Sequence, residues 1–359
     1  LAPALQRRLL PAAASSVAPG LTTPAPHATI HAMNTSRRIL DRRSFLHHAA
    51  ALGLGLPAAL AASDTPLPRR TLGRTGLEVT VCGLGSAPVG HSKPGAAVGV
   101  PVYRAALEAG INYVDTAHYY DDAETYLGEL MPEWRDRIVL ATKMRPDGAD
   151  TAARRANCAR QFEQSLRLLR TDHVDVLHLH SVGGYEPADL LAPDGPLDYA
   201  LQMKAEGKTR FVGITGHSRP ARFLPLLATG KIDVLMVALN FVDRHTYPFE
   251  QDVLPEARKQ NCGILAMKVF GGHSKGFSGY KNAGPARMPK EWMAEGFRYT
   301  LSLPDVACNV MGAYRAEEIV ECAGWACTFA PLDPAEMDAL RARGRDTAPG
   351  WGLRFGPAV

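Results

Sequence analysis

From Arg69 onward, short runs of β-branched and other apolar residues alternate with longer stretches whose apolar residues recur every three or four positions. The short runs predict buried strands and the longer spacing predicts amphipathic helices. We expect strands over residues 81–86, 112–116, 138–143, 174–180, 210–215, 234–240, 264–269 and 307–312. We expect helices over residues 102–109, 124–131, 152–170, 197–206, 220–227, 250–260, 290–301 and 316–326.

Eight strand–helix units in about 250 residues match the size of one (β/α)8 barrel. The pattern therefore predicts an α/β fold with a single TIM-barrel domain. Residues 69–81, with Gly73 and Gly76 at turn positions, predict a β-hairpin before the barrel. A doubly wound open sheet is the alternative, but no GxGxxG follows the first strand, and residues 83–87 hold two glycines, Gly83 and Gly85, without the third of a dinucleotide fingerprint.

The first 62 residues follow a different pattern, which is typical of a leader. Residues 1–32 are rich in alanine and proline, and Met33 is the start that we expect for the natural protein. Arg42 and Arg43, followed by Ser-Phe-Leu, resemble a twin-arginine export signal. The weakly apolar residues 49–62 are too short for a membrane span, which needs roughly 20 residues. We predict no stable membrane insertion.

This pattern predicts a disordered leader and signal at residues 1–62, a linker at 63–68, the barrel at 69–340 and a tail at 341–359. The leader implies recognition by the twin-arginine machinery and export of the folded protein to the periplasm. If the leader is instead only a disordered basic tail, the protein stays in the cytoplasm.

Composition narrows the function classes. Of the 359 residues, 46% are hydrophobic and 21% are charged, which excludes a disordered chain and a disulfide scaffold. The net charge is +4, but the leader alone holds six arginines against one acid, Asp41. The rest of the chain is close to neutral, so we predict no nucleic-acid partner. The six cysteines show no CxxC spacing, and we predict no iron–sulfur cluster.

Chemically useful side chains follow three neighbouring strands, where functional residues of a TIM barrel lie. Asp115 and Tyr120 follow the second strand, Lys143 ends the third, and His180 ends the fourth. A buried lysine needs a carboxylate partner, and Asp115 is placed to supply it. We expect Lys143 to lower the pKa of Tyr120, which would make this tyrosine a proton donor near neutral pH.

At these residues the chain resembles the aldo-keto reductase family. The resemblance rests on Asp115-Thr116-Ala117 with Tyr120 three residues later, on Thr142-Lys143 and on His180. Residues 70–77, 207–214 and 310–313 extend it over most of the chain after the leader. It implies transfer of a hydride from a nicotinamide cofactor to an aldehyde or ketone, or the reverse oxidation, without a metal. It also implies that Tyr120 donates the proton, His180 orients the carbonyl, and Lys143 and Asp115 tune Tyr120.

The resemblance also implies a cofactor site that departs from the family pattern. Thr215-Gly216-His217 replaces the usual Ser-Asn, and Met267 replaces a tyrosine that stacks on the nicotinamide. Arg315 lies one residue beyond the position of the usual arginine. Because a guanidinium suits a phosphate dianion, we expect NADP(H) rather than NAD(H), by a narrow margin. The expected cofactor residues are Thr215, Gly216, Met267, Lys268, Gly271, Gly312, Arg315 and Glu321.

Two other functions are compatible with these residues. A regulatory barrel would bind the nicotinamide cofactor with little turnover, and an aldolase-type barrel would use Lys143 to form a Schiff base without a nicotinamide. His178, two residues before His180, also faces the barrel, where we expect a hydrogen-bonded structural histidine. No third ligand accompanies this histidine pair, so no zinc site is predicted.

Overall fold

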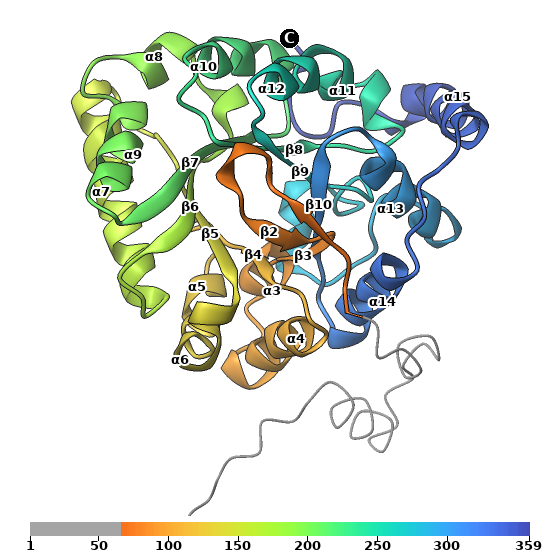
Figure 1. The fold of residues 1–359 in the computed structure, drawn as a ribbon, viewed down its shortest axis with the longest axis horizontal. Helices are drawn as coiled ribbons and strands as arrows, with labels where there is room; N and C mark the ends of the chain where they lie inside the picture. The colour runs from red at the N-terminus through yellow and green to blue at the C-terminus, as the bar shows by residue number, and fades with distance from the viewer. Residues whose placement is uncertain (1–65) are drawn as a thin grey trace, which may run out of the picture. The chain divides into compact units, whose positions relative to one another are not determined.

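The structure is a computed structural model, and it describes residues 66–359. Within this range, eight parallel strands form a closed barrel (Figure 1). Each strand pairs with its neighbours in chain order, and the last strand pairs with the first. In chain order the strands are β3 (Cys82–Gly85), β4 (Tyr113–Asp115), β5 (Val139–Met144), β6 (Val174–Leu179), β7 (Thr209–Gly216), β8 (Val234–Ala238), β9 (Gly263–Met267) and β10 (Val306–Gly312). The predicted TIM barrel is confirmed.

The helices surround the strands. They are α3 (Ala87–Ser92), α4 (Ala96–Glu108), α5 (Ala123–Gly128), α6 (Met131–Trp134), α7 (Thr151–Leu168), α8 (Pro187–Leu191), α9 (Pro196–Ala205), α10 (Leu224–Ala228), α11 (Phe249–Asp252), α12 (Leu254–Lys259), α13 (Met293–Ser302), α14 (Ala316–Cys327) and α15 (Pro334–Trp351). The helix expected over residues 250–260 is divided into α11 and α12, because Pro255 lies in the first turn of α12 and has no N–H to continue a helix.

A two-stranded hairpin precedes the barrel, as predicted. Its strands, β1 (Arg69–Thr71) and β2 (Glu78–Thr80), are antiparallel. Leu72, Leu77 and Val79 are buried against the side chains inside the barrel, so the hairpin closes the end at which the barrel strands begin. Figure 1 shows the hairpin crossing that end. The opposite end, where the strands finish, is called the mouth below.

The chain after residue 340 differs from the tail that the pattern indicates. Helix α15 continues to Trp351. Asp333 caps its start by accepting a hydrogen bond from the Glu336 N–H at 2.8 Å. The Trp351 indole N–H donates to Asp243 at 2.8 Å, and Phe355 is buried. The last twenty residues therefore pack on the barrel, next to the connections at its mouth.

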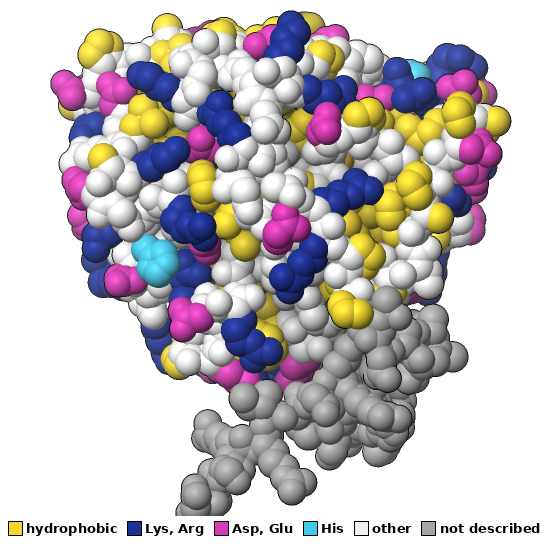
Figure 2. All heavy atoms as spheres, in the orientation of Figure 1, with side chains coloured by type: hydrophobic (Ala, Val, Ile, Leu, Met, Phe, Trp, Pro, Cys, Tyr) yellow, Lys and Arg dark blue, Asp and Glu magenta, His cyan; other side chains and the backbone are white. Residues whose placement is uncertain are grey.

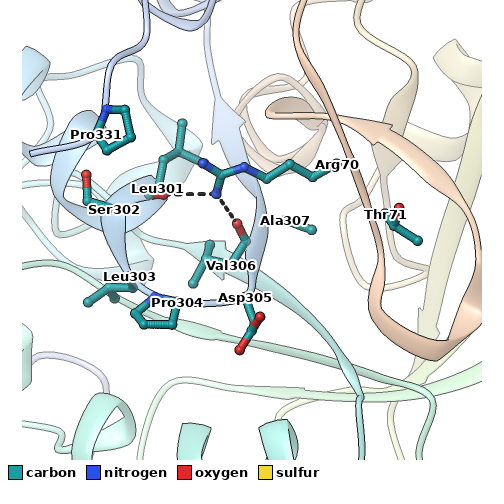
Figure 3. Close-up of a pocket in the computed structure, with 10 residues that line it drawn as sticks. All are labelled: Arg70, Thr71, Leu301, Ser302, Leu303, Pro304, Asp305, Val306, Ala307 and Pro331. Carbon is teal, nitrogen blue, oxygen red and sulfur yellow. Dashed lines mark hydrogen bonds between the residues drawn. The ribbon is translucent and has the colours of Figure 1, made fainter.

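The cavity drawn in Figure 3, of about 380 Å³, lies at the hairpin end of the barrel. Arg70 reaches across it and donates to the backbone carbonyls of Leu301 at 2.9 Å and Val306 at 2.6 Å. These bonds tie the hairpin to the connection before β10, so the cavity is a structural gap away from the mouth. Figure 2 shows basic and acidic side chains interspersed on the face that it presents.

Candidate active site

The four residues expected to carry the chemistry meet at the mouth. Asp115 ends β4, Lys143 lies near the end of β5, and His180 directly follows β6. The Lys143 ammonium donates to Asp115 at 2.6 Å and to the Thr116 carbonyl at 2.7 Å, with both side chains buried. Burial raises the pKa of Asp115 and lowers the pKa of Lys143, and their mutual attraction opposes both shifts.

Tyr120 lies between Lys143 and His180. The Lys143 Nζ is 4.7 Å from the centre of the Tyr120 ring, and the ring centres of Tyr120 and His180 are 5.6 Å apart at 86°. The expectation that Lys143 lowers the pKa of Tyr120 is wrong. Burial, followed by the charge of Asp115, raises this pKa, and the charge of Lys268 opposes the shift. The hydrogen bonds of Lys143 go to Asp115 and Thr116. The phenol therefore keeps its proton at neutral pH and is available as a donor.

The two histidines of the fourth barrel strand are both buried. Burial, followed by the charge of Lys143, lowers both pKa values well below the ordinary range, so both imidazoles are neutral. A neutral His180 carries one N–H that can donate to a carbonyl oxygen. The expectation of a hydrogen-bonded His178 is wrong, because residues 66–359 offer no partner to either ring nitrogen. Gly213 makes room for this ring, since a Cβ there would lie 2.2 Å from Nδ1.

Part of the expected cofactor set lines the mouth. Thr215 and Gly216 end β7, Met267 ends β9, and Gly271 follows it. The Thr215 hydroxyl already accepts a hydrogen bond from the Ser181 N–H at 3.3 Å. Gly271 has a φ of 71°, and a Cβ there would lie 2.2 Å from the Trp351 ring, so only glycine fits. Gly312 ends β10 beside Pro88.

Lys268 follows Met267 and stands beside the four central residues. Its ammonium donates to the Tyr280 hydroxyl at 3.0 Å, and it makes no ion pair with a carboxylate in the described part of the chain. Burial alone would lower the pKa of Lys268, but the neighbouring Tyr280 and Tyr120 hydroxyls outweigh it and raise the pKa. A positive charge in this position is suited to an anionic ligand.

Arg315 and Glu321 lie further out, on α14. Arg315 is exposed, and its guanidinium is 2.5 Å from the Glu318 carboxylate. The second Glu318 oxygen accepts from the N–H groups of Tyr314 at 2.8 Å and Arg315 at 3.3 Å. The N–H groups of Tyr314 and Arg315 are therefore already bound. Glu321 is half-buried, and Cys322 beside it is buried.

Two acids near Tyr120 were absent from the predicted site. Glu124 of α5 is buried and accepts from the Thr142 hydroxyl at 2.6 Å. Burial raises its pKa to about 7, and the Thr142 hydrogen bond opposes this shift. Asp121 directly follows Tyr120 and binds His91 at 2.7 Å. Their positions one and four residues after Tyr120 could have marked them as candidate site residues. Their partners, His91 and Thr142, lie far away in the sequence, so the sequence did not indicate these contacts.

Metal binding and membrane crossing find no support in residues 66–359. This part of the chain contains no group of three or more His, Cys, Asp or Glu side chains that could hold a metal ion. Its helices are all too short or too polar to cross a bilayer. The leader, with Arg42 and Arg43, lies outside the described residues.

Comparison with known proteins assigns the family. The model of the aldo/keto reductase family matches residues 83–321, more than half of the chain. The chain belongs to the aldo/keto reductase family. As an aldo-keto reductase it is an oxidoreductase. Membership leaves the aldolase interpretation without support.

Individual relatives are distant. L-galactose dehydrogenase of Arabidopsis thaliana is 32% identical over 215 residues, which cover 56% of this chain and 65% of that enzyme, just under two thirds of its length. An uncharacterized oxidoreductase of Bacillus subtilis, YqkF, is 27% identical over 70% of this chain and 89% of its own. The structure of an aldo-keto reductase from Klebsiella pneumoniae in complex with NADPH is 23% identical, with a TM-score of 0.62 over 81% of this chain and 99% of that chain. At this identity the structure supports the fold alone.

Proposed function

We propose that this aldo-keto reductase reduces an aldehyde or ketone with NAD(P)H, and that Tyr120 donates the proton. The observation that carries the proposal is the position of Tyr120 between Lys143 and His180, with a pKa raised by burial. A protonated phenol next to a neutral imidazole provides two donors for one carbonyl oxygen. When bound, the cofactor supplies the hydride that reaches the carbonyl carbon.

In this mechanism the side chains move one proton. His180 donates a hydrogen bond to the carbonyl oxygen and orients it. As the oxygen gains negative charge, the Tyr120 O–H bond breaks and its proton passes to that oxygen. The phenolate that remains is close to the positive charges of Lys143 and Lys268, and it regains a proton from solvent. In the oxidation direction, Tyr120 accepts the alcohol proton.

Two observations support binding of a dinucleotide at the mouth. Lys268 is a cation without a carboxylate partner among the described residues. Gly271, whose N–H donates to the Lys268 carbonyl at 2.7 Å, turns the chain tightly beside it where a side chain would collide with Trp351. We assign Thr215, Gly216 and Met267 to the nicotinamide end, and Lys268, Gly271 and Gly312 to the pyrophosphate. Arg315 would then bind the 2′-phosphate of NADP(H), and Glu321 would bind the adenine. This assignment favours NADP(H), and the Glu318 carboxylate beside Arg315 keeps the preference over NAD(H) small.

The direct test is a panel of aldehydes and ketones assayed by the loss of NADPH absorbance. We expect turnover with some members and none without cofactor. Tight NADPH binding without turnover of any carbonyl would instead support the regulatory barrel. Conversion of a carbonyl substrate in the absence of a nicotinamide would contradict the proposal.

We also propose that the leader exports the folded enzyme by the twin-arginine route. This proposal rests on Arg42-Arg43, which are followed by Ser-Phe-Leu and a weakly apolar stretch. The double substitution Arg42→Lys with Arg43→Lys should leave the full-length protein in the cytoplasm, as cell fractionation would reveal. Normal export of this variant would rule out the twin-arginine route.

A further inference from the structure

His91 is a second histidine beside Tyr120 that the four expected residues do not include. Its ring centre lies 5.4 Å from that of Tyr120, on α3 directly after the first barrel strand. The rings of Tyr119 and Tyr280 each lie 6.2 Å away. Tyr280 is also the hydroxyl partner of Lys268. His91 therefore forms part of the wall around the proposed proton donor.

Two backbone features bring His91 to this place. A Cβ on Gly90 would lie 2.2 Å from the Tyr120 carbonyl oxygen, so glycine allows α3 to approach the backbone of the tyrosine. Asp121 has a φ of 47°, in the left-handed region that few non-glycine residues adopt. Its carboxylate lies 2.7 Å from the His91 Nδ1 and 2.8 Å from the Lys93 ammonium.

The pairing with Asp121 determines which ring nitrogen remains for a ligand. In a neutral imidazole, the nitrogen that faces a carboxylate carries the proton and the other nitrogen is an acceptor. Asp121 faces Nδ1, so in the neutral form of His91 Nε2 is the acceptor, and residues 66–359 make no hydrogen bond to it. The side chain is 19% exposed, which leaves it accessible at the mouth.

A hydrogen-bond acceptor at the His91 Nε2 favours a ligand group that can donate a proton. A carboxylate or phosphate offers no proton to Nε2. An ammonium group would be repelled by Lys268, whose ammonium binds the hydroxyl of Tyr280, the ring 6.2 Å from His91. A neutral hydroxyl donates one hydrogen bond and meets neither penalty.

We propose that His91, oriented by Asp121, forms a subsite for a hydroxyl group of the substrate. The substrate is then a hydroxy-aldehyde or hydroxy-ketone, whose carbonyl lies at Tyr120 and His180 while a hydroxyl on the same molecule donates to the His91 Nε2. This inference rests on the proposed carbonyl reduction and specifies its substrate class.

The test uses pairs of aldehydes that differ by one hydroxyl group: propanal with lactaldehyde, and butanal with 3-hydroxybutanal. For at least one pair, we expect wild-type kcat/KM to favour the hydroxylated member by about tenfold, the scale of one neutral hydrogen bond. His91→Leu should reduce this ratio to about one. His91→Gln, which keeps an acceptor near the Nε2 position, should retain part of it.

His173→Leu is the matched control. His173 also pairs with a carboxylate, Asp172 at 2.7 Å, but it precedes β6 at the hairpin end of the barrel. This variant should keep the wild-type ratio. Equal loss of activity on both members of each pair in His91→Leu would show that His91 is structural and would overturn the subsite. A wild-type enzyme that reduces the plain aldehydes equally well would also overturn it, whereas no NADPH oxidation with any aldehyde would overturn the proposed function itself.

Discussion

The two ends of the barrel differ in how fully their buried polar groups are hydrogen-bonded. At the hairpin end, Asp175 accepts hydrogen bonds from Arg210 at 2.8 Å, Arg135 at 3.0 Å and the Leu140 N–H at 2.9 Å. Asp233 is held in the same manner by Lys204, Arg74 and the Val212 N–H. Each carboxylate ties neighbouring strands together and uses both of its oxygens.

At the mouth, buried polar atoms remain without partners among residues 66–359. They include Asp115 Oδ1, Thr116 Oγ1, His180 Nδ1 and both ring nitrogens of His178. Each unsatisfied buried group costs about 1–3 kcal/mol. Because a ligand could supply the missing hydrogen bonds, the unsatisfied groups indicate that ligands bind at the mouth. The same comparison separates residues that serve stability from residues that serve chemistry.

We expect the largest effect from a substitution at the mouth that removes activity and leaves stability unchanged. Tyr120→Phe keeps the ring between Lys143 and His180 but removes the proton donor, so kcat/KM for carbonyl reduction should fall by about 10²–10⁴. The melting temperature and NADPH binding should stay near those of the wild type. Tyr119→Phe is the matched control, because Tyr119 is 55% exposed and should tolerate the change. Equal losses in the two variants would place the proton donor elsewhere.

The opposite result is expected at the hairpin end. Asp233→Ala leaves Arg74, Lys204 and the Val212 N–H without their shared acceptor, and should lower the free energy of unfolding by about 3 kcal/mol. Urea denaturation measures this loss. The kcat per folded molecule should not change, since Asp233 lies at the far end from Tyr120. A large fall in kcat of the folded variant would contradict the division between the two ends.

A pH series sharpens the comparison at Glu124. Its pKa of about 7 in the folded protein lies above the ordinary 4.5, so the folded state keeps a proton that the unfolded state loses between these values. This contribution to stability is complete below about pH 4.5 and is lost as the pH rises through 7. Glu124→Gln should therefore match the wild type at low pH and be more stable by about 3 kcal/mol at pH 8. A difference that is constant over this range would exclude titration of Glu124 as its cause.

The smallest effect concerns the rim of the mouth. Because Glu318 already binds Arg315, we expect Arg315→Ala to weaken NADPH binding by only about 1 kcal/mol and to leave NADH binding unchanged. Glu318→Gln should strengthen NADPH binding, because it removes a competing negative charge. Titration by fluorescence quenching with both cofactors measures these changes. Equal losses for NADH and NADPH in Arg315→Ala would make this arginine structural.

Local patterns were sufficient for much of this molecule. Apolar runs predicted all eight barrel strands, and turn glycines predicted the hairpin, since both depend on residues close together in sequence. The order of Asp115, Tyr120, Lys143 and His180 along three strands predicted which side chains meet, because parallel strands finish at the same end. Helix limits were less certain where prolines interrupt the pattern, as between α11 and α12.

The tertiary structure decided what those side chains experience. The sequence indicated Lys143 as the cation that tunes Tyr120, but only the fold shows that its hydrogen bonds go to Asp115 and Thr116 and that burial raises the pKa of Tyr120. Only the fold brings His91 of α3 against Tyr120 and sets Glu318 on Arg315. A pKa, a hydrogen-bond partner and a ring contact depend on three-dimensional distance and on the exclusion of water, and residue spacing along the chain specifies neither.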